Sequence, residues 1–236
     1  NLLIFSGKGK VESFSGFIDD ITLKNYLEGK ESKILLSENK LYKSEPKIGI
    51  ARERKTLTSR EGYLYRATMI RLDRSISIFI KVLEADLPKS GIFQLGGESK
   101  TVYFEKLENN PLEYLEKIDL KLTEGIFKLY LATPAIFEKG WIPKWINEET
   151  MEGEFEGIKI KLISCSLGKL IRIGGWDMAK RAPKAMKKAV PPGSVYYFKV
   201  LSDISTEDIK EIFHLKNISD INPEEGFGLS LMGVIK

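Results

Sequence analysis

The chain has 236 residues, 42% of them apolar and 30% charged, with a net charge of +4, which is typical of a folded globular protein rather than a disordered one. Its most membrane-like stretch, residues 75–83, is far shorter than the roughly 20 apolar residues that a membrane helix needs. No secretory signal is visible and there is one cysteine, so we predict a cytoplasmic protein without internal disulfides.

The first half of the chain predicts one short helix and three strands. The sequence opens on Asn1 and an abrupt apolar run, residues 2–5, so we expect a preceding segment. Asp20 is placed to cap a helix over residues 21–27, which Gly29 ends. The polar and basic residues 30–60 predict a long surface excursion. Alternation of side chains then predicts three strands, over residues 63–72, 75–82 and 101–106. A glycine-rich connection at 95–99 lies between the second and the third.

The second half predicts strands and helices in a recognisable order. A strand over 127–131 precedes a helix over 143–149, and a strand over 158–163 extends through a bend at Gly168 to residue 173. A strand over 195–201, a capped helix over 205–215 and a last strand over 229–235 complete the chain. From residue 126 the order is β-α-β-β-α-β, which is that of a ferredoxin-like domain in an α+β fold.

The single cysteine and the single histidine restrict the chemistry. Cys165 alone cannot form a zinc cage, and its place in a strand favours packing. His214 falls in the last predicted helix, where a structural role is more common than a catalytic one. No metal or cofactor motif is found, which disfavours most hydrolase and metalloenzyme designs.

Positive charge is concentrated in two stretches. Six of the arginines lie between Arg52 and Arg74, and five cations without an acid lie between Lys180 and Lys188. Such clusters indicate a polyanionic partner, and a solvated face is the alternative. The many lysines and glutamates are also compatible with a thermophilic source.

Two loops could contact a nucleic acid. Residues 226–233, Gly-Phe-Gly-Leu-Ser-Leu-Met-Gly, could cradle phosphates, although a tight turn is the simpler interpretation. Because a strand rather than a helix follows, dinucleotide binding is excluded. In the basic loop after Gly174, Trp176 could stack on a base, but its size favours burial in a core.

These blocks together resemble a known family. In order and spacing they are similar to the third Cmr subunit of type III-B CRISPR effector complexes, a Cas-five-like group of the RAMP superfamily. The resemblance runs from about residue 48 to the end of the chain. The matching segments are Ile48–Ile50, Arg60–Tyr65, Leu95–Ser99, Gly174–Asp177, Lys184, Val190–Phe198 and Gly226–Gly233.

The resemblance implies an α+β protein of tandem ferredoxin-like (RRM-like) domains. The first, residues 1–110, would lack its N-terminal strand and carry the long basic insertion. The second, residues 111–236, would carry the glycine-rich loop near its end. It also implies a non-catalytic subunit without a cofactor, whose partners are the 5′ tag of the CRISPR RNA, the large palm-domain subunit and neighbouring RAMP backbone subunits.

Eleven residues are the predicted RNA contacts. Eight are cations chosen for their clusters, and three are glycines to which the resemblance assigns contact with the RNA backbone. They are Arg52, Arg54, Arg60, Lys180, Arg181, Lys184, Lys187, Lys188, Gly226, Gly228 and Gly233.

Two other functions stay open on the sequence. The chain could be a metal-independent RAMP endoribonuclease that processes CRISPR transcripts, with His214 or a lysine or tyrosine arrangement as its base. It could also be an unrelated small-molecule enzyme that uses the Gly226 loop.

Overall fold

The computed structural model describes residues 16–30, 36–96 and 100–235, which form two compact units. We call residues 16–19 and 36–114 the N-terminal unit, and residues 20–30 and 115–235 the C-terminal unit. The change at residues 114–115 is close to the predicted boundary, but the helix near residue 20 belongs to the C-terminal unit. The apolar run at 2–5 and part of the glycine-rich connection, 97–99, lie outside the described residues.

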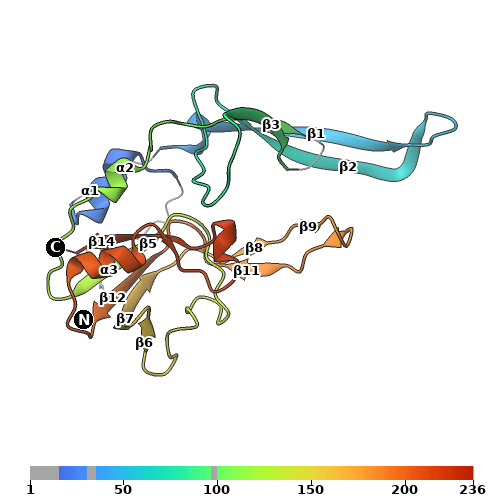
Figure 1. The fold of residues 1–236 in the computed structure, drawn as a ribbon. Coiled ribbons are helices and arrows are strands. Elements are labelled where there is room, and N and C mark those ends of the chain that lie inside the picture. Colours follow the sequence, from blue (N-terminus) through green and yellow to red (C-terminus); the bar gives the residue numbers. More distant parts are fainter. Residues whose placement is uncertain (1–15, 31–35, 97–99, 236) are drawn as a thin grey trace, which may run out of the picture. The chain divides into compact units, whose positions relative to one another are not determined.

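Two antiparallel hairpins make up the N-terminal unit. Strand β1 (Tyr42–Arg52) pairs with β2 (Ser59–Leu72), and β3 (Ser90–Gln94) pairs with β4 (Thr101–Glu105). A short 3₁₀ helix, η1 (Glu38–Lys40), precedes β1. Strands β2 and β4 confirm their predictions, and β2 is longer than expected. The β1–β2 hairpin forms a long twisted ribbon (Figure 1).

The N-terminal unit departs from the sequence predictions in two places. Strand β1 lies within the stretch predicted to be a surface excursion. Pro46 is opposite Thr68 in this strand, and an edge strand tolerates a residue that lacks an N–H. Conversely, residues 75–82 form no strand, since no described segment pairs with them. A segment with strand preference forms a strand only where a neighbouring strand supplies its hydrogen-bonding partners.

Burial differs sharply between the units. Every buried apolar side chain among the described residues belongs to the C-terminal unit, and the described part of the N-terminal unit contributes none. The N-terminal hairpins therefore have no hydrophobic core of their own within the described ranges.

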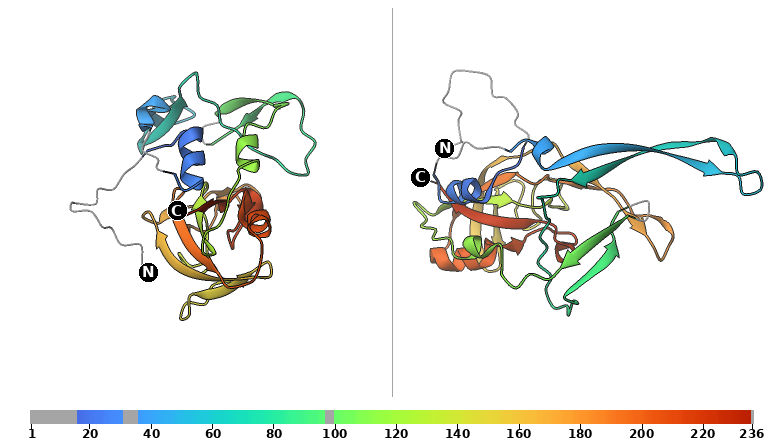
Figure 2. Two further views of the ribbon diagram at one scale, coloured as in Figure 1. Left: turned by 90° about the vertical axis from the view of Figure 1, so that its left-hand side faces the viewer. Right: turned by 90° about the horizontal axis from the view of Figure 1, so that it is seen from above.

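The C-terminal unit is built on a six-stranded antiparallel sheet, in the order β13-β14-β5-β12-β7-β6. Figure 2 shows the ribbon of this unit from two further sides. The strands of the sheet are β5 (Ile126–Leu131), β6 (Glu152–Phe155), β7 (Ile158–Ser166), β12 (Val195–Val200), β13 (Lys216–Asn217) and β14 (Leu229–Val234). The helices are α1 (Asp20–Leu27), α2 (Glu113–Glu116, which begins in the N-terminal unit), α3 (Thr206–Phe213) and the 3₁₀ helix η2 (Pro223–Glu225). The predicted α+β class and the main strands of this half are confirmed.

One face of the sheet carries the core. Alternation along β5 places Phe127 on this face, where its ring stacks 5.6 Å from that of Phe198 on β12 and 5.4 Å from Phe213 of α3. Helix α3 begins at the predicted cap, since Ser205 accepts a hydrogen bond from the Asp208 N–H. Trp145 packs on Phe198 from the same side.

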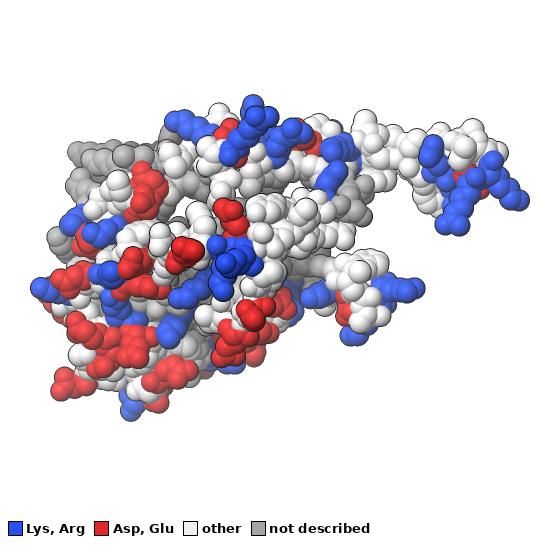
Figure 3. Space-filling view, turned by 45° about the horizontal axis from the view of Figure 1, so that its top comes forward, with Lys and Arg blue, Asp and Glu red and all other residues white. Residues whose placement is uncertain are grey.

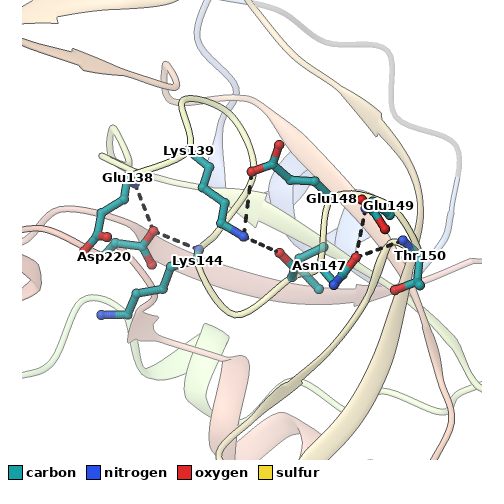
Figure 4. A network of polar contacts seen from close by, with 9 residues as sticks. Glu138, Lys139, Lys144, Asn147, Glu148, Glu149, Thr150 and Asp220 are labelled. Atoms are coloured by element: carbon teal, nitrogen blue, oxygen red, sulfur yellow. Dashed lines mark hydrogen bonds and ion pairs between the residues drawn. The ribbon is translucent and has the colours of Figure 1, made fainter.

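The helix predicted over 143–149 is replaced by consecutive turns (Figure 4). The Asp220 carboxylate accepts hydrogen bonds from the backbone N–H groups of Glu138 and Lys144, at 3.1 and 2.9 Å. The Asn147 side chain accepts from the N–H groups of Glu149 and Thr150. Side-chain acceptors thus satisfy backbone groups that a helix would have satisfied internally, which is how Asp and Asn compete with helices.

Helix α1 covers part of the opposite face of the sheet. The Lys128 ammonium lies 3.7 Å from the centre of the Tyr26 ring, and Tyr26 meets Tyr130 edge-on. A Cβ added at Gly233 would lie 2.9 Å from the backbone of Leu27, so only glycine allows α1 to pack so closely on β14.

Candidate nucleic-acid interface

Residues 171–189 form a hairpin that we call the basic arm (Figure 1). Strand β8 (Ile171–Ile173) pairs with β11 (Lys187–Ala189) near the sheet, and β9 (Trp176–Asp177) pairs with β10 (Ala182–Pro183) farther out. The predicted continuation of the strand at 158–163 is therefore a separate strand with a different partner. At the base, Val190 and Ala135 exchange two backbone hydrogen bonds within the buried core.

The end of the basic arm is a turn organised by Asp177. Its carboxylate accepts hydrogen bonds from the N–H groups of Ala179 and Lys180, at 3.0 and 2.9 Å. Arg181 closes the turn with a left-handed φ of 51°. Asp177 therefore has a structural task, and the turn presents the neighbouring cations outward.

The basic arm brings five of the predicted RNA contacts together. Lys180, Arg181, Lys184 and Lys188 are exposed, and Lys187 is half-buried, with its ammonium 3.4 Å from the Asn222 side chain. Asp177 lies 3.9 Å from Lys180. Across the described ranges no carboxylate lies within ion-pair distance of the other four cations of this group, so their charge is available to a polyanion.

Apolar side chains of the basic arm also face solvent. Trp176 is 55% exposed and Met178 is 81% exposed, so the preference for a buried Trp176 was wrong. A two-stranded arm has no second layer in which to bury an indole. Its position beside cations instead suits stacking on an unpaired base.

The remaining predicted cations lie at the end of the β1–β2 ribbon, in the other unit. Arg52, Arg54 and Arg60 are all exposed, and the Arg60 guanidinium lies 4.3 Å from the centre of the Tyr63 ring. Figure 3 shows Lys and Arg side chains gathered at the end of this ribbon and on the basic arm. The ribbon and the arm thus present the same combination of exposed cations and aromatic rings.

Two cations of these clusters were missed by the sequence analysis. Lys55 lies in the ribbon turn between Arg54 and Arg60, and Arg172 lies on β8; both are exposed. The signal for Lys55 was its place in the arginine-rich stretch. For Arg172 the signal was its place between two isoleucines in the alternating stretch Ile171–Ile173, which forms the exposed strand β8.

Two of the predicted glycine contacts are accounted for by packing. Gly228 is buried, with a φ of 76°, and a Cβ there would lie 2.4 Å from the Ser219 nitrogen. Gly233 is buried against α1, where a Cβ would meet the backbone of Leu27. Neither is on the surface of the described structure, which favours a role in close packing over the predicted contact with RNA.

Gly226 is exposed, but its loop is closed on itself. The Gly226 N–H donates to the Pro223 carbonyl, and the Gly228 N–H donates to the Pro134 carbonyl. Thr133 accepts from the Leu229 N–H and donates to the Gly226 carbonyl. A phosphate cradle needs free N–H groups, and these three are already bonded, while Glu224 and Glu225 add negative charge beside the loop.

His214 is held as a neutral bridge inside the C-terminal unit. Its Nδ1 accepts a hydrogen bond from the Met232 N–H at 3.1 Å, so its Nε2 carries the proton and donates to the Leu115 carbonyl at 2.9 Å. Burial lowers the pKa of its imidazole. Both nitrogens are occupied and the side chain is buried, so His214 is not placed to act as the base of a ribonuclease.

Neither a metal site nor a membrane helix emerges from the described ranges. They hold no group of three or more His, Cys, Asp or Glu side chains placed to bind a metal ion. Among the helices described, none is both long and apolar enough to span a bilayer.

Comparison with known proteins gives the class of the chain. The family model described as CRISPR-associated protein (Cas_Cmr3) matches residues 5–235. A search of curated proteins found no match. The chain therefore belongs to the Cas_Cmr3 family of CRISPR-associated proteins, which confirms the family resemblance.

Chains of similar fold are also found among solved structures. One similar chain comes from the cryo-EM structure of the type III-B Cmr-beta bound to cognate target RNA, with a TM-score of 0.50 and 18% identity; the match covers 83% of this chain and 63% of that one. Another, from Cmr-beta bound to cognate target RNA and AMPPnP, has a TM-score of 0.42 and 20% identity, with coverages of 72% and 52%. The first match shows a shared fold, and this chain spans less than two thirds of either neighbour's length.

Proposed function

We propose that the chain is a non-catalytic RNA-binding subunit of a type III-B CRISPR (Cmr) effector complex. It would hold the 5′ tag of the CRISPR RNA and contact the large palm-domain subunit and neighbouring RAMP subunits, in the cytoplasm. The observation that carries the proposal is the basic arm, which presents exposed cations beside an exposed Trp176. Cations bind phosphates irrespective of sequence, and a free indole stacks on an unpaired base.

The topology of the C-terminal unit supports a ferredoxin-like domain. Its four main strands, taken in chain order as first to fourth, lie in the sheet in the order fourth, first, third, second. The turns at 132–151 occupy the place of the first crossover helix. We propose that RNA is bound by the hairpins rather than by the sheet face used in RRM domains, because α1 covers Lys128 and Tyr130 on the face opposite the core.

A salt titration with matched variants tests the proposal. The RNA carries its repeat-derived 5′ tag, and an equally long RNA with a scrambled tag is the control. For single strands each phosphate that a cation neutralises adds about 0.7 to the steepness of the log–log slope, so R181A/K184A/K188A is expected to flatten the slope by about 2. The control variant K144A/K159A/K199A removes three exposed lysines elsewhere in the same unit and is expected to keep the wild-type slope.

Each outcome has a distinct meaning. Preference for the tagged RNA, with a flatter slope for the arm variant alone, supports the proposed function. Equal slopes for both variants would show that the basic arm makes no phosphate contacts. Cleavage of the RNA on a denaturing gel, without added metal, would favour the ribonuclease alternative and contradict a non-catalytic role.

A further inference from the structure

The β1–β2 ribbon has two chemically different faces. Directly opposed residues share a face, and alternate pairs place five aliphatic side chains on one side. We call this side the apolar face; its pairs are Tyr42–Leu72, Ser44–Ile70, Pro46–Thr68, Ile48–Arg66 and Ile50–Leu64. Ile48 is 73% exposed and Ile70 is 66% exposed, so this surface is open to solvent in the described structure.

The other face of the ribbon is satisfied within the N-terminal unit. Arg71 and Glu45 form a bidentate ion pair, with nitrogen–oxygen distances of 2.7 and 2.9 Å. The Tyr65 ring lies over Gly49, the residue directly opposite. The ribbon is therefore amphipathic, and it is the apolar face that lacks a covering layer in the described structure.

Such a face needs a partner for physical reasons. A two-stranded hairpin alone is marginally stable in water, and it gains stability from a third strand or a packed layer. Nine residues at about 3.4 Å each, across two strands about 10 Å wide, give an apolar face of roughly 300 Å². This is about the size of the largest apolar patch on a typical monomeric protein, and such a patch is often a functional surface.

The chemistry of the face selects the class of partner. Its one charged residue is Arg66, near the middle, and it has no acid. A second copy packed symmetrically would bring two Arg66 side chains together without a counter-charge, which disfavours self-association. RNA offers no aliphatic layer to cover isoleucine and leucine. We infer that the apolar face docks a protein partner whose own apolar surface carries a carboxylate opposite Arg66.

This inference rests on the proposed role as a subunit of an assembly, but not on any RNA contact. The first experiment places the photo-crosslinker p-benzoylphenylalanine at Ile70, or at Lys43 on the polar face as a control. Each full chain is co-expressed with the other subunits of its own complex, irradiated and analysed by mass spectrometry. Cross-links from position 70 to a peptide of another protein subunit, with few from position 43, are the expected result.

A second experiment measures assembly with variants that keep strand preference. I48T/I70T replaces two side chains of the apolar face, and I92T/Y103T replaces an exposed opposed pair on β3–β4 as the matched control. We expect the first variant to bind the remaining subunits at least tenfold more weakly, and the control to match the wild type.

The outcomes separate this inference from the proposed function. The inference is overturned if position 70 cross-links only to RNA, to a second copy or to the same chain. It is also overturned if both variants assemble equally well. In either case the proposed function stands if the wild type co-purifies with tagged RNA and other subunits. A wild-type chain that co-purifies with no other subunit overturns both.

Discussion

His214 shows how a single residue that suggests catalysis can instead hold the fold together. Its ring joins the Leu115 carbonyl to the Met232 N–H, and so ties α2 to β14. Burial, and to a smaller extent the nearby Lys210 ammonium, lowers the pKa of the ring in the folded protein. Below about pH 6.5, the ordinary pKa of histidine, His214 therefore binds a proton more readily in the unfolded chain than in the folded one.

The prediction for His214 is a loss of stability in acid. The free energy of unfolding is expected to fall as the pH drops below about 6.5, until the folded pKa is reached. His214→Gln removes the titrating group, so the stability of this variant is expected to change less over the same pH range. Urea unfolding followed by circular dichroism measures the free energy of unfolding of both proteins. His214→Ala also removes two buried hydrogen bonds and is expected to cost about 2–4 kcal/mol at pH 7. Identical pH profiles for the wild type and His214→Gln would contradict this account.

At the scale of elements, helix α1 is docked on a lysine that is costly to bury. Burial lowers the pKa of Lys128 to about 8, although its ammonium lies over the Tyr26 ring. Between that value and its ordinary pKa of about 10.5, the unfolded chain holds more protons than the folded one. The contribution of Lys128 to stability is therefore least favourable below pH 8 and improves as the pH rises toward 10.5.

Lys128→Met tests this balance. The substitution keeps a long apolar stem and removes the buried charge, so it is expected to raise the free energy of unfolding by about 1–2 kcal/mol at pH 7. The gain should shrink by pH 10, where the folded wild type is already largely neutral at this position. Lys199→Met, at an exposed site on β12, is the matched control. A loss of stability for Lys128→Met at pH 7 would mean that the cation–π contact outweighs the cost of desolvation.

The sequence predicted individual elements well where local pattern and packing agree. Ser205 capped α3 as expected, and the alternation in β5, β7 and β12 placed apolar side chains on the core face. The prediction failed at residues 75–82, where apolar alternation has no neighbouring strand. It also failed at β1, which was predicted to be part of a surface excursion, because only the pairing shows that Pro46 lies in an edge strand. Trp176 was misplaced for a related reason, because whether an arm has a second layer is a tertiary property.

At the scale of the whole molecule, the two units differ in what holds them together. The C-terminal unit has a continuous buried core, whereas the N-terminal unit has none among its described residues. In the isolated chain we expect hydrogen exchange to be slow in β5, β12 and β14 and fast throughout 36–114. Hydrogen–deuterium exchange read by mass spectrometry measures both in one sample. Equal protection of the two units would show that the N-terminal hairpins are covered within the chain itself.

Of the candidate site, only the clustering of positive charge could be predicted from the sequence. The two basic clusters were visible in the sequence, and the structure places both on hairpins. The glycine motif was equally visible, but only the contacts of Gly228 with Ser219 and of Gly233 with Leu27 show that its glycines serve close packing. Sequence spacing cannot tell a glycine that meets a ligand from one that meets its own backbone.

The edges of the six-stranded sheet and of the β1–β2 ribbon differ, and this difference has a consequence for how the protein must be expressed in the cell. The six-stranded sheet ends in the short strands β13 and β6, which offer little backbone to a stray strand. In the described structure β1 and β2 pair only with each other, so each keeps an unpaired backbone edge along its length. Copies made in excess of their partners would be exposed to edge-to-edge aggregation and to proteolysis. We therefore expect the soluble amount of the chain to follow the amount of its partners rather than its own rate of synthesis.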